Sequence, residues 1–200
     1  MNILILSANW RADLVKAFQA ALAELGGGKV VAADMSPLSA ALFQSDHLEI
    51  VPPLDSPGFI DRLEGLCERH RISAIVPSID KDLPFLAAHR ERLLASGITA
   101  VVSSPETIAI CDDKHLTYQF FIEQSIPTPR TWLPDELPQE PDWPLLIKPR
   151  RGIGGKGIHR IDNYEELEFY LERIENPVLQ EFLPGPEYSF DTLSDFEGNV

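Results

Sequence analysis

Residues 145–161 read LLIKPRRGIGGKGIHRI, and two apolar runs frame a glycine-rich centre in this stretch. The runs at 145–148 and 158–161 are typical of strands, and the glycines between them predict a turn. Residues 148–160 also carry five Lys and Arg side chains and no acid. Glycines let backbone N–H groups approach an anion, and the cationic side chains compensate its charge. The stretch therefore predicts a polyphosphate-binding hairpin, although a mobile surface turn could have the same composition.

This hairpin differs from two common nucleotide-binding loops. A Walker loop, GxxxxGK[ST], leads into a helix, whereas GGKG at residues 154–157 leads into a predicted strand. A dinucleotide-binding turn, GxGxxG, follows the first strand of a βαβ unit, but residues 7–11 contain no glycine after the first apolar run. The sequence therefore disfavours a Rossmann-type oxidoreductase.

Outside the hairpin the chain is acidic. Its 200 residues carry 17 Lys and Arg against 31 Asp and Glu, and the net charge is −14. This balance disfavours binding to nucleic acid or to an anionic membrane. No apolar run approaches the roughly 20 residues that a membrane helix needs. Cys67 and Cys111 lack the spacing of a metal or disulfide site, so we expect buried thiols in a cytoplasmic protein.

The first half of the chain alternates apolar runs with helical periods. The predicted strands are residues 3–6, 30–33, 47–51, 74–76 and 98–102. The predicted helices are residues 14–25, 59–69 and 83–95. Alternation with short connections predicts an α/β domain over residues 1–105, in which helices cover an open, Rossmann-like parallel sheet. Asp80 and Asp82 follow the run at 74–76 and could orient a substrate, or simply start a helix; Arg11 could hold a carboxylate.

Residues 106–200 have a different pattern and predict a second domain. We expect a linker helix over 106–124, a proline-rich connection over 126–144 and an α+β subdomain over 145–200. In that subdomain Asn163 can cap a helix, and the further strands are expected at 178–183 and 188–193. Residues 197–200 are typical of a turn that opens another strand, so we expect this domain to be incomplete at its C-terminus.

Three motifs resemble those of ATP-grasp enzymes, in the same order. Residues 111–117, CDDKHLT, resemble the "DK" helix of that family, and residues 148–158, KPRRGIGGKGI, resemble its lysine and flexible glycine loop. Residues 180–191, QEFLPGPEYSFD, resemble its adenine hinge and ribose-binding strand. Residues 33–37, ADMSP, and 77–83, PSIDKDL, are similar to the pre-ATP-grasp domain of short proteins like the carbamoyl-phosphate synthase large subunit.

The resemblance implies that ATP phosphates are bound by two lysines and a glycine loop. Lys114 and Lys148 would contact the phosphates, although Lys114 could also be an ordinary surface residue. The loop would close over the phosphates and exclude water. Its glycines are Gly152, Gly154, Gly155 and Gly157.

The resemblance also implies a site for the nucleoside. Glu181, Phe182 and Leu183 would form the adenine hinge, in which Glu181 could contribute only its backbone. Glu187 would accept hydrogen bonds from the ribose hydroxyls, or be a plain exposed strand carboxylate.

The activity implied by this resemblance is an ATP-dependent carboxylate–amine or carboxylate–thiol ligase. A carboxylate would be activated as an acyl phosphate, and a nucleophile would displace the phosphate. Both substrates would be small molecules, and a homo-oligomer is compatible with this activity. The ligands of Mg²⁺ are expected beyond residue 200, so the 200-residue chain alone is not expected to turn over. The alternative is a non-catalytic relative that binds ATP as a sensor or regulator.

Overall fold

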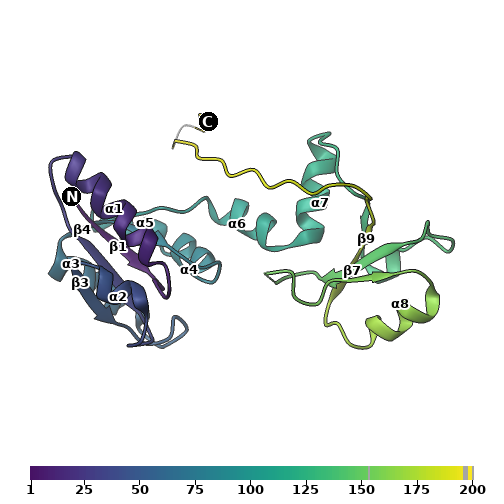
Figure 1. Ribbon diagram of the computed structural model, residues 1–200, viewed down its shortest axis with the longest axis horizontal. Helices are drawn as coiled ribbons and strands as arrows, with labels where there is room; N and C mark the ends of the chain where they lie inside the picture. Colours follow the sequence, from purple (N-terminus) through teal and green to yellow (C-terminus); the bar gives the residue numbers. More distant parts are fainter. Residues whose placement is uncertain (153, 196–197, 200) are drawn as a thin grey trace. The chain divides into compact units, whose positions relative to one another are not determined.

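The computed structural model describes residues 1–152, 154–195 and 198–199, which form two compact units, Met1–Asp112 and Asp113–Val200 (Figure 1). The first unit contains a five-stranded parallel sheet with the order β3-β2-β1-β4-β5. Its strands are β1 (Asn2–Leu6), β2 (Val30–Asp34), β3 (His47–Ile50), β4 (Ile72–Pro77) and β5 (Thr99–Ala100). Its helices are α1 (Ala12–Glu24), α2 (Ala40–Gln44), α3 (Phe59–His70), α4 (Asp82–Ala88), α5 (Arg90–Ala95) and α6 (Pro105–Asp112). The predicted open parallel sheet is confirmed.

The central strand β1 explains why this sheet needs a continuous apolar run. Ile3 and Ile5 pack in the core cluster that includes Val15 of α1, whereas Leu4 belongs to the cluster on the other face with Leu63 of α3. Successive side chains of a strand point to opposite faces. Helices therefore cover both faces of the sheet, and each fully buried aliphatic side chain contributes about 1.5–3 kcal/mol.

The second unit contains an antiparallel sheet with the order β6-β9-β7-β8. Its strands are β6 (Thr131–Trp132), β7 (Leu145–Pro149), β8 (His159–Ile161) and β9 (Pro177–Glu181). Its helices are α7 (Lys114–Glu123), the 3₁₀ helix η1 (Pro134–Glu136) and α8 (Tyr164–Leu171). Leu167 of α8 packs on Leu145, Ile147 and Leu179 of the sheet. The α+β character predicted for this part of the chain is confirmed.

The linker helix expected over 106–124 is instead two helices, α6 and α7. Asp113 separates them with extended backbone (φ −120°, ψ 109°), and its side chain caps α7. Helix α6 packs against α4 and belongs to the first compact unit, Met1–Asp112. The helix expected over 83–95 is likewise divided, at His89, into α4 and α5.

The connection over 126–144 is more ordered than its prolines suggested, because β6 and η1 lie within it. Residues 188–193, in contrast, form no strand in the structure as described. Cys67 is buried as expected, but Cys111 is exposed, which corrects the prediction for that thiol. The turn expected at 197–200 includes Glu197 and Val200, which lie outside the described residues.

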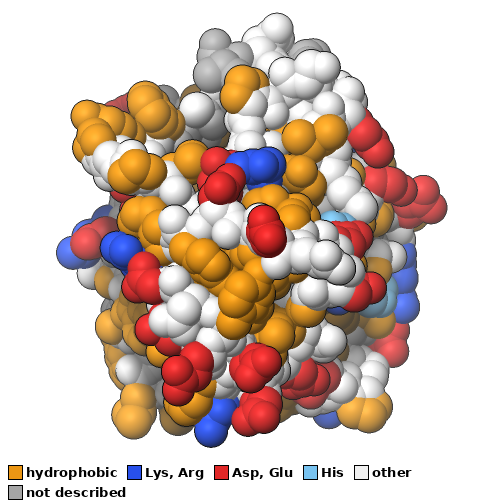
Figure 2. All heavy atoms as spheres, turned by 90° about the vertical axis from the view of Figure 1, so that its right-hand side faces the viewer, with side chains coloured by type: hydrophobic (Ala, Val, Ile, Leu, Met, Phe, Trp, Pro, Cys, Tyr) orange, Lys and Arg blue, Asp and Glu red, His pale blue; other side chains and the backbone are white. Residues whose placement is uncertain are grey.

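The surface of the second unit has the acidic character expected from its sequence. Acidic side chains are scattered among apolar ones over the face that Figure 2 shows. Residues 113–200 carry 8 Lys and Arg against 17 Asp and Glu, which is a net charge of −9. Within the described ranges, no helix combines the length and the apolar character that crossing a bilayer requires.

Candidate functional site

Lys148 lies on β7 with a half-buried side chain and a neutral partner. Its ammonium donates a hydrogen bond to Oε1 of Gln180 on β9 at 2.7 Å. Nε2 of Gln180 donates in turn to Oγ1 of Thr131 on β6 at 2.9 Å, so three strands hold the lysine. Burial lowers the pKa of Lys148, and the positive charge of Lys114 lowers this pKa further. This cation has no ion-pair partner among the residues that the structure describes, so it is available to an anion.

Lys114 is the first residue of α7 and lies at the root of the glycine loop. Its backbone N–H donates to the carbonyl oxygen of Arg150 at 3.1 Å. Its ammonium approaches the carbonyl oxygens of Arg150 at 3.5 Å and Gly152 at 3.2 Å. The structure therefore brings the two predicted phosphate-binding lysines, Lys114 and Lys148, to the same end of β7.

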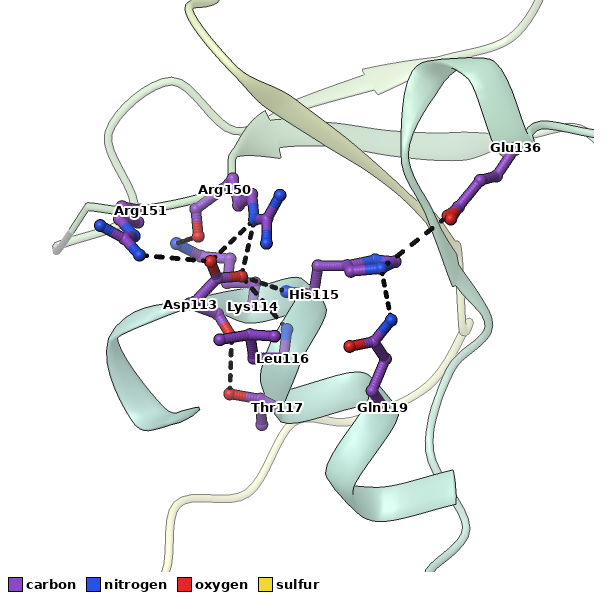
Figure 3. Close-up of polar contacts among 9 residues, drawn as sticks. All are labelled: Asp113, Lys114, His115, Leu116, Thr117, Gln119, Glu136, Arg150 and Arg151. Atoms are coloured by element: carbon purple, nitrogen blue, oxygen red, sulfur yellow. Dashed lines mark hydrogen bonds and ion pairs between the residues drawn. The ribbon is translucent and has the colours of Figure 1, made fainter. Parts of the chain in front are cut away.

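The position of Lys114 depends on the buried side chain of Asp113 (Figure 3). Oδ1 of Asp113 caps α7 by accepting the N–H groups of His115 at 3.0 Å and Leu116 at 3.1 Å. The Nε–H of Arg150 is shared between the two carboxylate oxygens, each at 2.8 Å. Arg151 also approaches the carboxylate, with NH2 at 3.6 Å from Oδ2.

Asp113 and Arg150 line a cavity of about 450 Å³ together with Arg151, Glu175 and Asn176. Burial alone would raise the pKa of the Asp113 carboxyl, but the hydrogen bonds from Arg150 and the helix N–H groups outweigh burial and lower the pKa. Sequence reasoning counted the arginines only as charge and did not identify Asp113. An aspartate is a preferred helix cap, but helical residues lie on both sides of Asp113, so no periodic signal marked it in the sequence.

The glycine loop has a backbone that other residues rarely adopt. Gly154 has φ +70° and Gly157 has φ +74°, both in the left-handed region. At Gly157 a Cβ atom would also lie 3.0 Å from Cγ of Pro149. The predicted turn thus requires glycine for conformation and, at Gly157, for space. Residue 153, within the loop, lies outside the described residues.

The predicted adenine hinge begins at the other end of the ladder between β7 and β9. Glu181 is paired with Leu145, whereas Pro149, next to the loop, is paired with Pro177. Four residue steps of about 3.4 Å separate these two ends by about 14 Å. The predicted hinge and the predicted phosphate loop therefore lie apart on one strand pair, which suits an elongated ligand.

The side chains of the predicted hinge residues lie in different surroundings. Oε2 of Glu181 accepts the N–H of Arg130 at 3.1 Å. The ring of Phe182 lies 5.1 Å from the guanidinium carbon of Arg160. Leu183 is exposed, and Glu187 is exposed on an irregular segment and not on the expected strand. The nucleotide-binding roles of these residues stay predictions.

No three His, Cys, Asp or Glu side chains are grouped to hold a metal ion in the described parts of the chain. Mg²⁺ prefers carboxylate, phosphate and water oxygens. The protein ligands of Mg²⁺ that were expected beyond residue 200 therefore stay a prediction.

The carboxylate at the end of β2 forms hydrogen bonds within the first unit. Asp34 lies there, and its side chain accepts the N–H groups of Asn9 at 2.6 Å and Ser36 at 2.8 Å. In a dinucleotide-binding fold a carboxylate at this place would reach a ribose hydroxyl. Asp34 instead holds the turn after β1, which agrees with the absence of a glycine turn in residues 7–11.

Comparison with known proteins assigns both units to families. Residues 3–101 match the PylC-like N-terminal domain, and residues 111–200 match the ATP-grasp domain. The chain is an ATP-grasp protein. Its predicted resemblance to ATP-grasp enzymes and to the large subunit of carbamoyl-phosphate synthase is confirmed.

Two curated relatives of this ATP-grasp protein are ligases or synthases by name. A carbamoyl-phosphate synthase of Methanobrevibacter smithii is 26% identical over 156 residues, which cover 74% of this chain and 41% of the relative. A D-alanine–D-alanine ligase of Petrotoga mobilis is 33% identical over 106 residues, which cover 50% of this chain and 35% of the relative.

Solved structures share the fold of this ATP-grasp protein. The N5-carboxyaminoimidazole ribonucleotide synthetase of Thermotoga maritima superposes with a TM-score of 0.64 at 22% identity, over 90% of this chain and 46% of that one. The L-amino acid ligase of Bacillus licheniformis gives a TM-score of 0.69 at 20% identity, over 92% and 45%. The chain thus spans less than half the length of each of these four proteins.

Proposed function

We propose that the protein is an ATP-dependent ligase that joins a small-molecule carboxylate to an amine or thiol through an acyl phosphate. The observation that carries this proposal is the placement of Lys114 and Lys148 beside the glycine loop. Lys148 is half-buried, its hydrogen-bond partner is neutral and its charged neighbour is another lysine. Two such cations next to backbone that requires glycine suit the phosphate chain of a nucleotide.

In the proposed reaction the protein positions ATP and stabilises charge. The bond from the γ-phosphorus to its bridging oxygen breaks, a bond from phosphorus to the carboxylate oxygen forms, and ADP leaves. The nucleophile then attacks the acyl carbon, the carbon–oxygen bond to phosphate breaks, and inorganic phosphate leaves as the nucleophile loses a proton. Lys114 and Lys148 compensate phosphate charge, and the closed loop excludes water from the acyl phosphate. Mg²⁺, when bound to the nucleotide, neutralises further phosphate charge.

The relatives support this class of reaction. They include a carbamoyl-phosphate synthase and D-alanine–D-alanine ligases. The biotin carboxylase domain of the Hydrogenobacter thermophilus 2-oxoglutarate carboxylase has a TM-score of 0.66 at 21% identity, and its structure is a dimer with MgADP and bicarbonate. ATP, Mg²⁺ and a small carboxylate or bicarbonate are therefore the ligands that we propose to test first. A homo-oligomer stays a proposal of the same kind.

Binding of ATP is tested by thermal melts of the full-length protein with and without MgATP. A ligand that binds only the folded state stabilises it by about 2.7 kcal/mol at 100 times its dissociation constant. We expect Lys148→Ala to remove most of this stabilisation. The control is Lys16→Ala, which removes an exposed lysine of α1 in the first unit. If MgATP stabilises Lys148→Ala and wild type equally, the assigned role of Lys148 is wrong.

Catalysis is tested by ADP release over a panel of carboxylates and amines. A ligase releases ADP only when a matching carboxylate is present, and forms a condensed product when the matching amine or thiol is added. MgATP binding without ADP release over the whole panel would instead favour the non-catalytic, ATP-sensing alternative.

A further inference from the structure

The carboxylate of Asp113 does more than a helix cap requires. A cap needs one acceptor oxygen, and Oδ1 alone accepts the N–H groups of His115 and Leu116. A neutral Asn or Ser would provide the same cap without burying a charge. The Asp113 side chain is 2% exposed, and its second oxygen lies against Arg150 and Arg151. Burying an ionised group this deeply is costly unless the group is paired, and the arginines supply the pairing. Helix capping alone does not explain why the residue at this position is charged.

Arg150 joins three segments of the second unit through three different groups. Its backbone N–H donates to the carbonyl oxygen of Asn176 at 2.9 Å, just before β9. Its own carbonyl oxygen accepts the backbone N–H of Lys114 at 3.1 Å. Its Nε–H donates to both oxygens of Asp113 at 2.8 Å. A shift of Arg150 would therefore move or disrupt the end of β7, the segment before β9 and the start of α7.

Lys114 is held in place by the same contacts between Asp113 and Arg150. Its backbone follows directly on Asp113, and its ammonium lies 3.5 Å from the carbonyl oxygen of Arg150 and 3.2 Å from that of Gly152. Figure 3 shows Asp113 between the start of α7 and the two arginines that follow β7. The pair of Asp113 and Arg150 thus sets the distance between the Lys114 ammonium and the root of the glycine loop.

We propose that Asp113 is a positioning residue for nucleotide binding, and this inference rests on the proposed function. By holding Arg150, Asp113 fixes the Lys114 ammonium and the first residues of the glycine loop in the places where they meet the phosphate chain. Asp113 itself contacts no ligand. Its role predicts a loss of affinity that is confined to the phosphate part of the nucleotide.

The decisive variant is Asp113→Asn, which keeps the volume and a capping oxygen but removes the charge. In the full-length protein we expect it to weaken MgATP binding at least tenfold and to change adenosine binding less than twofold. Adenosine has no phosphates, so it depends on the hinge and not on Lys114. We expect Arg150→Gln to have the same effect. The double variant Asp113→Asn/Arg150→Gln should bind MgATP no more weakly than the single variant with the lower affinity, because both substitutions disrupt the same ion pair.

The matched control is Asn163→Ala, which removes a side-chain cap of the same kind from α8. We expect this variant to melt earlier, because a lost cap costs about 1 kcal/mol, but to bind MgATP as wild type does. Equal MgATP binding by Asp113→Asn and wild type would overturn the inference. Parallel losses of MgATP and adenosine binding would also overturn it, because they indicate a general loss of structure.

A second measurement separates this inference from the proposed function. Amide hydrogen exchange of residues 113–117 and 145–152 is expected to be at least tenfold faster in Asp113→Asn than in Asn163→Ala, without any nucleotide. If wild type binds no MgATP, the proposed function fails. The exchange rates still decide whether Asp113 holds the start of α7 against Arg150. Unchanged exchange in Asp113→Asn would show that it does not.

Discussion

Three aspartates in the described residues, Asp34, Asp82 and Asp113, are less than a tenth exposed, and their partners differ. The Nε–H of Arg150 donates to Asp113, and the pKa of that carboxyl is lowered in spite of burial. Asp82 accepts Oγ–H of Ser7 at 2.7 Å and the N–H of Ser78 at 3.3 Å, which are both neutral donors. Burial raises the pKa of Asp82, and the charge of Asp34 adds to the increase. The partner, and not burial alone, therefore decides the direction of the pKa shift.

The raised pKa of Asp82 predicts a pH dependence of stability. Between the pKa of an unfolded aspartate, about 3.9, and the raised folded value, the folded state binds more protons. The contribution of Asp82 to the free energy of unfolding therefore falls as the pH rises from about 4 through the folded pKa. Asp82→Asn removes this contribution, so the stability of Asp82→Asn relative to wild type should increase over that interval.

Denaturant midpoints of both proteins at a series of pH values from 4 to 7 measure this difference. Asp80→Asn is the control, because Asp80 is exposed next to the same helix. A difference between Asp82→Asn and wild type that stays constant with pH would contradict the prediction.

At the scale of elements, the glycine loop connects β7 and β8 of one antiparallel pair. Its ends are set by the ladder, so the turn must close within a fixed span. The left-handed residues make this closure possible, and a Cβ atom at Gly157 would lie 3.0 Å from Cγ of Pro149, which would have to shift to admit it. The loop is therefore sensitive to substitution at different positions for different reasons.

Two alanine variants separate these reasons. Gly154→Ala places Cβ in open space and should cost only the left-handed backbone, about 1–2 kcal/mol. Gly157→Ala adds the contact with Pro149 at 3.0 Å, so its free energy of unfolding and its MgATP affinity should both fall further. Thermal melts and nucleotide titrations of the two variants test the order. Equal effects of the two substitutions would contradict this order and show that Pro149 moves aside at no measurable cost.

At the scale of the whole molecule, each unit has a sheet and a core of its own. The clusters around β1 lie in Met1–Asp112, and the cluster around β7 lies in Asp113–Val200. The residues that we propose for the nucleotide all belong to the second unit. We therefore expect nucleotide binding to affect the second unit more than the first.

Amide exchange of the full-length protein tests this division. We expect MgATP to slow exchange in residues 113–117, 148–157 and 180–183, because these segments carry the proposed phosphate and hinge contacts. Exchange in the buried strand β1 should stay the same. Protection confined to residues 7–11 and 78–82, at the carboxyl edge of the first sheet, would place the nucleotide in the wrong unit and contradict the proposed site.

The sequence by itself determined the class of both units, and its resemblance to ATP-grasp enzymes indicated the two lysines that we propose for the nucleotide. The apolar run of β1, the helical period of α3 and the glycines after Lys148 are local patterns, because neighbours along the chain impose them. The break of the predicted linker helix at Asp113 was missed, since helical residues lie on both sides and only the capping contact marks it. The two-residue strand β6 was missed because it is too short to show a period.

Only the tertiary structure decided how the site is held together. The contact of Arg150 with Asp113 joins positions 37 residues apart, and that of Lys148 with Gln180 joins positions 32 residues apart. No periodicity along the chain encodes such pairs, because they depend on how strands and helices pack in space. The same reason applies to Asp82. The sequence does not distinguish it from Asp80, but in the folded protein Asp80 is exposed, whereas Asp82 is buried and accepts a hydrogen bond from Ser7.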